Sequence, residues 1–217
     1  MSGSAALRMP EPVRAAVERE LAGAVAEEEL AWMSWAGTVW RVRARGRTVF
    51  VKRAAQLEDE RDRLAWLHGR WPVPEAIGFF HDMGDDWLVT REVRGVPLHD
   101  RSLRWEPGRV ARTLGEILRG LHATDAAGCP FGVRKPGNVL VHGDYCLPNV
   151  LVEDGKLSAL VDVGGAGLGN PEVDLAAGVW TLQYNYGAGL ARTFLDAYGW
   201  PPMSDKAVEK LRRKYSR

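Results

Sequence analysis

One short stretch constrains this chain more than any other. Residues 141–152 read VHGDYCLPNVLV, and residues 160–164 read LVDVG. Asp154-Gly155, which lies between them, is a strong signal for a two-residue turn joining two strands. A hairpin of this length folds Asp162 back toward Asn149, and Asp144 lies five residues before that Asn. Three oxygen-bearing side chains are therefore expected to converge.

Such a set suits phosphoryl transfer, in which the protein mainly positions the acceptor and neutralises charge on phosphate oxygens. Mg²⁺ takes oxygen ligands and keeps several waters, so one or two carboxylates and an amide oxygen are enough to hold it. Asn149 and Asp162 are the expected metal ligands, and Asp144 is expected to accept or orient the proton of an acceptor hydroxyl. Alternatively, each residue is a turn former or a strand-end cap. That interpretation would suffice for any one of them alone, whereas the complete set indicates a kinase.

The first half of the chain predicts a place for the nucleotide. Residues 38–45 and 48–53 have the composition of two strands of a hairpin, and residues 57–71 carry apolar side chains at helical spacing. Lys52 lies on the second strand and Glu60 on the helix, where the two can face each other. The alternative is an ordinary solvated ion pair, because a lysine and a glutamate eight residues apart are common on any surface.

Two segments that contain glycine are candidates for a phosphate-binding loop. Ser34, Gly37 and Thr38 are expected to form a loop over the phosphates, although they match a glycine loop only weakly. Residues 164–169 are richer in glycine, but a dinucleotide fingerprint requires glycine at the next position, where the chain has Asn170. The sequence also contains no P-loop motif.

These motifs together resemble the aminoglycoside phosphotransferase family, above all its 3′-phosphotransferases. The likeness covers most of the chain, since further segments occur in the family's order: 50–52, 59–64, 73–74, 86–89, 121–122, 129–131, 170–176 and 194–199. The resemblance implies that Lys52 contacts the α- and β-phosphates and that Glu60 is its ion-pair partner. It likewise implies that Asp144 is the catalytic aspartate and that Asn149 and Asp162 are the metal ligands. Mg²⁺ and ATP or GTP are the implied cofactor and co-substrate.

The implied fold is α+β: a two-lobed, protein-kinase-like fold with a small β-rich N-lobe and a mostly helical C-lobe. We expect the N-lobe to span residues 1–93 and the C-lobe residues 94–217, because a strand at 87–90 gives way to a segment with Gly and Pro. Backbone groups of Glu92 and Val93 are expected to hold the purine edge. Helices are predicted in the second lobe at residues 107–124, after Pro171, and at residues 188–198 and 204–215.

The composition of the chain limits which kinds of binding partner and which cell compartment are expected. A chain of 217 residues with 46% hydrophobic content can bury a substantial core, and a net charge of +1 gives no reason to expect a nucleic-acid partner.

Cys129 and Cys146 lack metal-ligand spacing and are expected to be free thiols in a reducing compartment. No run of eighteen apolar residues occurs and residues 1–12 carry no apolar core of a signal peptide. The protein is therefore expected to be cytoplasmic, without a membrane partner. His122 and His142 are predicted to be structural rather than proton carriers.

The chain departs from the family at three places, of which the first two bear on the acceptor. Only residues 132–140 stand where 3′-phosphotransferases carry a long helical insertion with acidic residues that hold the antibiotic. The C-terminal segment 210–217 is basic, so it would repel a polycation if it folded toward the site; alternatively it is a solvated helix end. Gly165 stands where relatives often have arginine.

The sequence thus predicts a phosphotransferase that moves the terminal phosphate of ATP or GTP to a hydroxyl of a small molecule, an aminoglycoside being the favoured acceptor. A kinase of another small hydroxyl compound, a nucleotide-binding relative without useful catalysis and a two-lobed scaffold remain open. No pattern indicates an oligomeric state.

Overall fold

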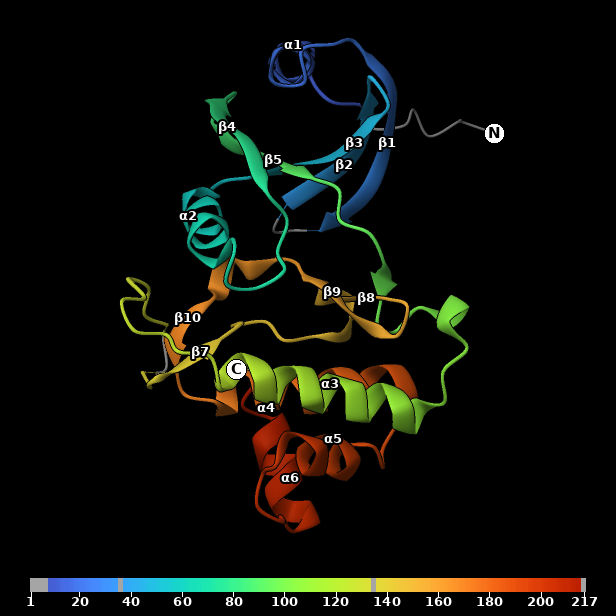
Figure 1. Ribbon diagram of the computed structural model, residues 1–217, viewed down its shortest axis with the longest axis vertical. Coiled ribbons are helices and arrows are strands. Elements are labelled where there is room, and N and C mark those ends of the chain that lie inside the picture. The colour runs from blue at the N-terminus through green and yellow to red at the C-terminus, as the bar shows by residue number, and fades with distance from the viewer. Residues whose placement is uncertain (1–7, 35–36, 134–135, 216–217) are drawn as a thin grey trace. The chain divides into compact units, whose positions relative to one another are not determined.

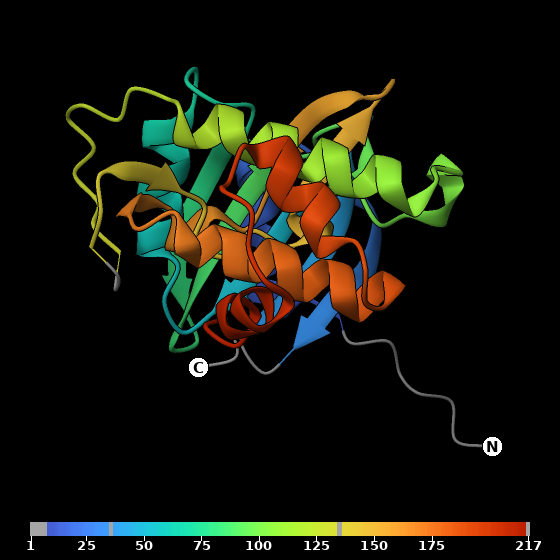
Figure 2. The ribbon, with the colours of Figure 1, turned by 90° about the horizontal axis from the view of Figure 1, so that it is seen from below.

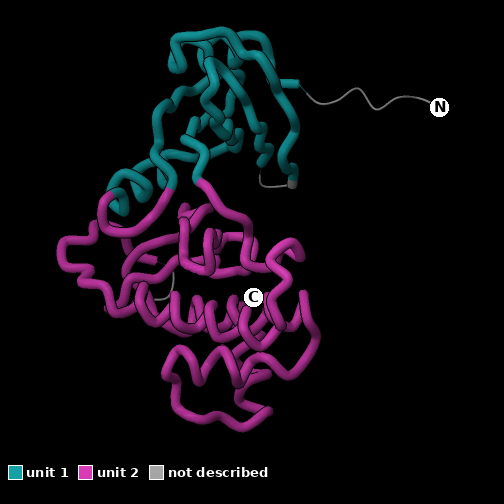
Figure 3. The backbone as a smooth tube through the Cα atoms, turned by 45° about the vertical axis from the view of Figure 1, so that its right-hand side comes forward, with its two compact units in different colours: residues 1–68, 74–93 teal, residues 69–73, 94–217 magenta. Residues whose placement is uncertain are grey.

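The computed structural model describes residues 8–34, 37–133 and 136–215 (Figure 1). The chain divides into two compact units, shown in different colours in Figure 3. Unit 1 comprises residues 1–68 and 74–93, and unit 2 comprises residues 69–73 and 94–217.

Unit 1 contains a five-stranded antiparallel sheet with the strand order β1-β2-β3-β5-β4. Its strands and two helices are α1 (Glu11–Glu20), β1 (Val25–Ser34), β2 (Gly37–Ala44), β3 (Arg47–Ala54), α2 (Glu58–Leu67), β4 (Ala76–Asp82) and β5 (Asp85–Arg91). Arg45 and Gly46 join β2 to β3 with φ of 49° and 70°, which is the left-handed pair that a tight hairpin requires. The predicted hairpin that carries Lys52 is confirmed.

The core of unit 1 lies between α1 and one face of the sheet. Val13 and Val17 of α1 pack with buried side chains from β2, β3 and β5. Trp40 and Trp87 stack there with ring centroids 5.6 Å apart, and both are almost completely buried. Burial of two such rings supplies much of the apolar area that stabilises this unit.

Helix α2 begins where Asp86 accepts the backbone N–H of Leu57 at 2.8 Å. Because this bond satisfies a donor that the first turn leaves open, it caps the helix from a neighbouring strand. The helix ends at Leu67 rather than at the predicted residue 71, since His68 leaves the helical conformation with ψ of 127° and Gly69 has φ of 79°. Glu60 lies on the buried face of α2.

Unit 2 contains helices and short strands. They are β6 (Val96–Pro97), η1 (Arg101–Leu103), α3 (Pro107–His122), β7 (Val139–Val141), η2 (Leu147–Asn149), β8 (Val150–Glu153), β9 (Lys156–Leu160), η3 (Val163–Gly165), β10 (Gly167–Gly169), α4 (Glu172–Tyr186), α5 (Ala191–Tyr198) and α6 (Asp205–Arg212). The view in Figure 2 shows α3, α4 and α5 side by side, and these helices contact one another. Gly115 allows α3 to approach α5 closely, because a Cβ at this position would lie 2.4 Å from the carbonyl oxygen of Phe194 on α5.

Two small sheets position the loops of unit 2. One has the order β6-β8-β9 and the other pairs β7 with β10, all antiparallel. Asp154 and Gly155 join β8 to β9 with φ of 50° and 79°, so the predicted hairpin is confirmed. No helix among the described residues is long and apolar enough to cross a membrane.

Candidate functional site

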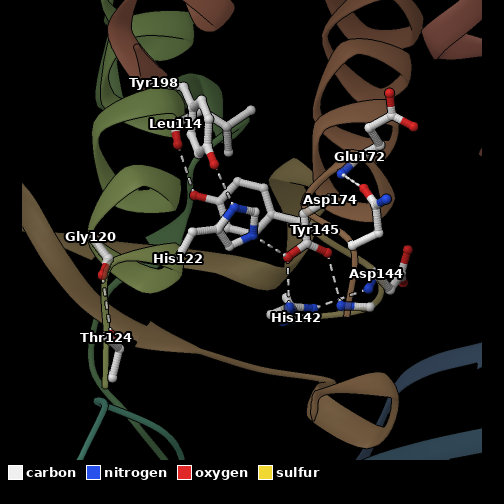
Figure 4. Close-up of polar contacts among 12 residues, drawn as sticks. Leu114, Gly120, His122, Thr124, His142, Asp144, Tyr145, Glu172, Asp174 and Tyr198 are labelled. Atoms are coloured by element: carbon white, nitrogen blue, oxygen red, sulfur yellow. Dashed lines mark hydrogen bonds and ion pairs between the residues drawn. The ribbon is translucent and has the colours of Figure 1, made fainter. Parts of the chain in front are cut away.

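The loop that carries Asp144 leaves β7 and is held from α4. The carboxylate of Asp174 accepts the backbone N–H of His142 at 2.6 Å (Figure 4) and also that of Gly143 at 2.8 Å. Tyr145 adds a second anchor, because its fully buried hydroxyl donates to the carbonyl of Leu114 on α3 at 2.9 Å. Burial raises the pKa of that phenol, which stays a donor. Asp144 therefore lies between two fixed points.

Asp174 itself is completely buried, so its charge must be met by donors. Besides the two backbone groups, Nε2 of His122 lies 3.0 Å from its Oδ2, and the hydroxyl of Tyr198 lies 2.9 Å from Nδ1 of the same ring (Figure 4). Burial and then the nearby Asp174 raise the pKa of Tyr198. His122 therefore binds the carboxylate that holds the loop, which supports the structural role predicted for it.

His142 ties the loop to the strand that precedes Asp162. Its Nε2 lies 3.0 Å from the carbonyl oxygen of Val161, and its Nδ1 accepts the backbone N–H of Asp144 at 3.3 Å. Because the carbonyl needs a donor and the N–H needs an acceptor, the ring is neutral with its proton on Nε2. The predicted role of His142 in orienting the loop is confirmed.

Asn149 lies between Asp144 and the hairpin. Its side-chain nitrogen donates to the carbonyl oxygen of Asp144 at 2.9 Å and to Oδ2 of Asp144 at 3.1 Å. The amide oxygen is consequently the atom left for a metal ion. The backbone oxygen of Asn149 accepts the N–H of Val161 at 3.0 Å, so Asn149 lies beside the residue that precedes Asp162.

Asp162 is exposed and has φ of 59°, a left-handed conformation that Asp tolerates better than most residues. Among the residues that the structure describes, no group of three or more His, Cys, Asp and Glu side chains gathers as a metal centre. Asn149 and Asp162 nevertheless fit Mg²⁺, because this ion takes only one or two protein carboxylates and draws its other oxygens from phosphates and water.

Gly143 and Gly165 bring two loops into backbone contact. Gly143 has φ of 88°, and a Cβ there would lie 2.2 Å from the carbonyl oxygen of Gly165. A Cβ at Gly165 would instead meet the Cα of Gly143 at 3.4 Å, an ordinary contact distance. The absence of a side chain is therefore required at 143 but not at 165.

The C-terminal segment reaches Asp144. The hydroxyl of Tyr215 donates to Oδ1 of Asp144 at 2.6 Å, and the thiol of Cys146 lies 3.5 Å from the same oxygen. The sequence did not predict the contact of Tyr215, because no local pattern links residues 71 positions apart in the chain. Burial raises the pKa of both groups, to about 12 for Cys146. Both cysteines are free thiols.

The predicted helix 204–215 is shorter than expected. Helix α6 ends at Arg212, because Lys214 and Tyr215 donate to carbonyls three residues earlier and tighten the last turn. Much of the basic charge in this segment is paired within unit 2: Lys214 with Glu172, and both Arg212 and Arg213 with Glu209. These pairs lower the repulsion that this segment would exert on a polycation.

Lys52 and Glu60 meet within unit 1. Nζ of Lys52 lies 2.6 Å from Oε2 of Glu60, with side chains 20% and 11% exposed. Partial burial makes this pair less screened by solvent than a surface pair. The expected ion pair between strand β3 and helix α2 is present.

The structure says less about the residues that are predicted to form a loop over the phosphates. Ser34 ends β1 and Gly37 and Thr38 open β2, while residues 35–36 between them lie outside the described residues. A Cβ at Gly37 would lie 2.6 Å from the carbonyl oxygen of Arg53, so packing on β3 already explains this glycine.

Glu92 and Val93 are the last residues of unit 1. The carboxylate of Glu92 binds Arg41 at 2.8 Å, and its backbone N–H donates to the carbonyl of Thr48 at 3.2 Å. Since this N–H is already hydrogen-bonded, a purine would have to bind to other backbone groups of Glu92 and Val93.

The described part of the short segment 132–140 packs against β10. Val133 donates to the carbonyl of Leu168 at 3.1 Å, and a Cβ at Gly137 would lie 2.0 Å from the carbonyl oxygen of Gly169. The described residues of this segment, 132–133 and 136–140, form no helix.

Comparisons with known proteins agree on one family. The family model described as the phosphotransferase enzyme family matches residues 29–137 and 133–210. Among curated proteins, a probable aminoglycoside 3′-phosphotransferase of Lactococcus lactis subsp. lactis (strain IL1403) is 26% identical in an alignment 187 residues long, which covers 66% of this chain and 71% of that protein.

Solved structures are similar as well. The crystal structure of an aminoglycoside 3′-phosphotransferase of type VIII has a TM-score of 0.71 and 28% identity, covering 86% of this chain and 91% of that one. An aminoglycoside phosphotransferase APH(4)-Ia, crystallised as a ternary complex with AMP-PNP and hygromycin B, has a TM-score of 0.66 over 95% of each chain. At 14% identity the latter shows the fold alone. The expected α+β, protein-kinase-like fold is confirmed.

Proposed function

Because the chain belongs to the phosphotransferase enzyme family, we propose that it moves the terminal phosphate of ATP or GTP to a hydroxyl of a small molecule, with aminoglycosides as the favoured acceptors. The observation that carries the proposal is the hydrogen-bonded connection of Asp144, Asn149 and the residue before Asp162 in unit 2. Phosphoryl transfer depends on positioning such groups rather than on covalent work by the protein.

Asp144 is the proposed catalytic residue. Its carboxylate orients the acceptor hydroxyl and takes up its proton, a role that contributes typically about 10²–10⁴-fold in rate. The bonds from Asn149 to Asp144 and from Asp174 to the preceding residues hold the loop in place before an acceptor binds. A pre-positioned base saves the ordering cost during the reaction.

Asn149, through its amide oxygen, and Asp162 are the residues proposed to hold Mg²⁺. When bound, the ion neutralises negative charge on the phosphate oxygens. The pairing of Val161 with Asn149 supports this assignment, because it keeps the two ligand-bearing segments adjacent.

Lys52 is the proposed contact to the α- and β-phosphates, and Glu60 keeps its ammonium group oriented. Ser34, Gly37 and Thr38 are proposed to lie over the phosphates, and backbone groups of Glu92 and Val93 to contact the base. Unit 1 supplies all of these residues.

Aminoglycosides are the favoured acceptors because relatives found by sequence carry that activity in their names. The short segment 132–140 lacks the acidic insertion that would hold several ammonium groups. A kinase of another small hydroxyl compound is therefore the second candidate. A nucleotide-binding relative without useful catalysis is the third.

The test is a turnover assay combined with nucleotide binding. Nucleoside diphosphate release is measured with Mg²⁺, ATP or GTP and a panel that includes kanamycin, neomycin and amino sugars. We expect turnover that Asp144→Asn lowers by about 10²–10⁴-fold with nucleotide affinity retained. Turnover only on other hydroxyl compounds would favour the second candidate, and binding without product in either form would favour the third.

A further inference from the structure

The acceptor position on the proposed base is already held by a hydroxyl of the chain. Oη of Tyr215 lies 2.6 Å from Oδ1 of Asp144 and donates its proton to that oxygen. An acceptor hydroxyl must make the same contact before its phosphorylation, because its proton leaves to this carboxylate. Both residues belong to unit 2.

Several contacts hold Tyr215 in this place. Its ring lies 5.0 Å from the ring of Trp180 on α4 at an angle of 44°, and Trp180 stacks in turn on Tyr184. The thiol of Cys146 lies 3.4 Å from the phenolic oxygen. Lys214, the preceding residue, forms an ion pair with Glu172 at the start of α4. Packing, a polar contact and a charge pair therefore act on the same segment.

We propose that Tyr215 is an intramolecular phosphoryl acceptor, so that the chain phosphorylates its own phenolic oxygen when no other acceptor displaces it. The inference rests on the proposed function, since it uses Asp144 and the same nucleotide. It adds a modification site at the C-terminal segment.

The step balances without a further reactant. The bond between the γ-phosphorus and the oxygen bridging the β- and γ-phosphates breaks, and a bond from that phosphorus to Oη of Tyr215 forms. The phenolic proton passes to Oδ1 of Asp144 and then to solvent, while the nucleoside diphosphate leaves. A phosphoryl-transfer transition state with little bond formation to the nucleophile does not require prior ionisation of the phenol.

The product changes the site electrostatically. A phosphotyrosine carries a charge of about −1.5 to −2 at neutral pH. Beside the carboxylate of Asp144 this charge is repelled, so the modified side chain leaves the base and frees it for an external hydroxyl. Self-phosphorylation would thus precede efficient transfer to a small molecule.

The experiment incubates the whole chain with Mg²⁺ and γ-labelled ATP or GTP without any acceptor, and maps the label by peptide mass spectrometry. We expect one phosphate per chain on Tyr215, at an initial rate per molecule that does not depend on protein concentration. Tyr215→Phe and Asp144→Asn should lose the label. Tyr184→Phe is the matched control and should keep the label. The ring of Tyr184 stacks on Trp180, as the ring of Tyr215 does from another angle, but it is the hydroxyl of Tyr215 that contacts Asp144.

Folding is checked by the melting temperature, which Tyr215→Phe should keep within a few degrees because the ring remains on Trp180. Turnover of an acceptor without phosphate on Tyr215 would overturn the inference and leave the proposed function intact. The same holds if the unsubstituted chain takes up no label and Tyr215→Phe accelerates acceptor turnover. Tyr215 would then only occupy the position of the acceptor hydroxyl without being phosphorylated. Label that survives Asp144→Asn also contradicts the inference, whereas failure to bind nucleotide at all would remove the proposed function with it.

Discussion

The backbone N–H of Gly143 donates a 2.8 Å hydrogen bond to Oδ1 of Asp174, a residue 31 positions later in the chain. Gly143 immediately precedes Asp144, so a carboxylate on helix α4 determines where the proposed base begins. That carboxylate is fully buried and also binds His122 and the N–H of His142.

Asp174→Ala should destabilise unit 2 strongly. The substitution leaves the N–H groups of His142 and Gly143 and the His122 ring without their acceptor inside the protein, and each unsatisfied buried donor costs about 1–3 kcal/mol. We expect a loss of about 3 kcal/mol or more in the free energy of unfolding, measured by urea denaturation. Asp205→Ala, which removes a 91% exposed carboxylate, is the control and should change stability by less than about 0.5 kcal/mol. Equal midpoints for the two variants would contradict the assigned role.

Gly143→Ala and Gly165→Ala form a matched pair, of which only the first should lower stability and activity. At 143 the methyl group would lie 2.2 Å from a backbone oxygen, and φ is 88°. We expect a loss of about 2 kcal/mol or more together with most of the activity. At 165 the nearest contact is 3.4 Å, so stability should change by no more than about 0.5 kcal/mol. Thermal melts and turnover of both variants check this, and a tolerated Gly143→Ala would show that the loops are not in the described contact.

Lys52→Met should weaken nucleotide binding. The variant keeps the length and apolar stem of the side chain but removes the charge that lies 2.6 Å from Glu60. Loss of one charge-assisted contact to phosphate, about 1.5–3 kcal/mol, corresponds to roughly a tenfold to hundredfold weaker Kd. Isothermal titration with Mg²⁺-nucleotide measures it. Arg43→Met, which breaks the exposed pair with Glu27, should leave the Kd unchanged; an equal loss in both variants would point to a general charge effect.

Cys146 should make the protein sensitive to high pH. Burial is the main cause that raises its pKa from 9.0 to about 12, with Asp144 adding to the effect. Since the folded protein favours the neutral thiol, the associated stability is fully present below pH 9 and is lost as the pH rises toward 12. Stability measured between pH 8 and pH 11 should therefore fall less steeply in Cys146→Ala than in the unmodified chain. Parallel curves would be evidence against a buried thiol.

Reactivity offers a second measurement on the same thiol. At neutral pH an alkylating reagent should label the partly exposed Cys129 before Cys146, and both equally in denaturant. Faster labelling of Cys146 in the folded protein would contradict its burial.

Local structure followed from local sequence. The turns at Arg45-Gly46 and Asp154-Gly155 adopt the left-handed pairs that their glycines permit, so both hairpins were predictable. Helix α3 begins at Pro107 as its apolar spacing and proline indicate. Helix ends were predicted less well, since a last turn depends on the carbonyl that each N–H finds. Strand β1 was not predicted, because its glutamates at 27–29 are unusual in strands and its pairing with β2 compensates.

The sequence by itself determined the identities and order of Lys52, Glu60, Asp144, Asn149 and Asp162, and the hairpin that returns the chain beside Asn149. These features depend on spacing and turn chemistry, which act over a few residues. Only the tertiary structure decided that Asp174 holds the loop before Asp144 and that Tyr215 donates to Asp144. The physical reason is that such contacts join residues 31 and 71 positions apart, and their partners are selected by the packing of helices rather than by any periodic pattern.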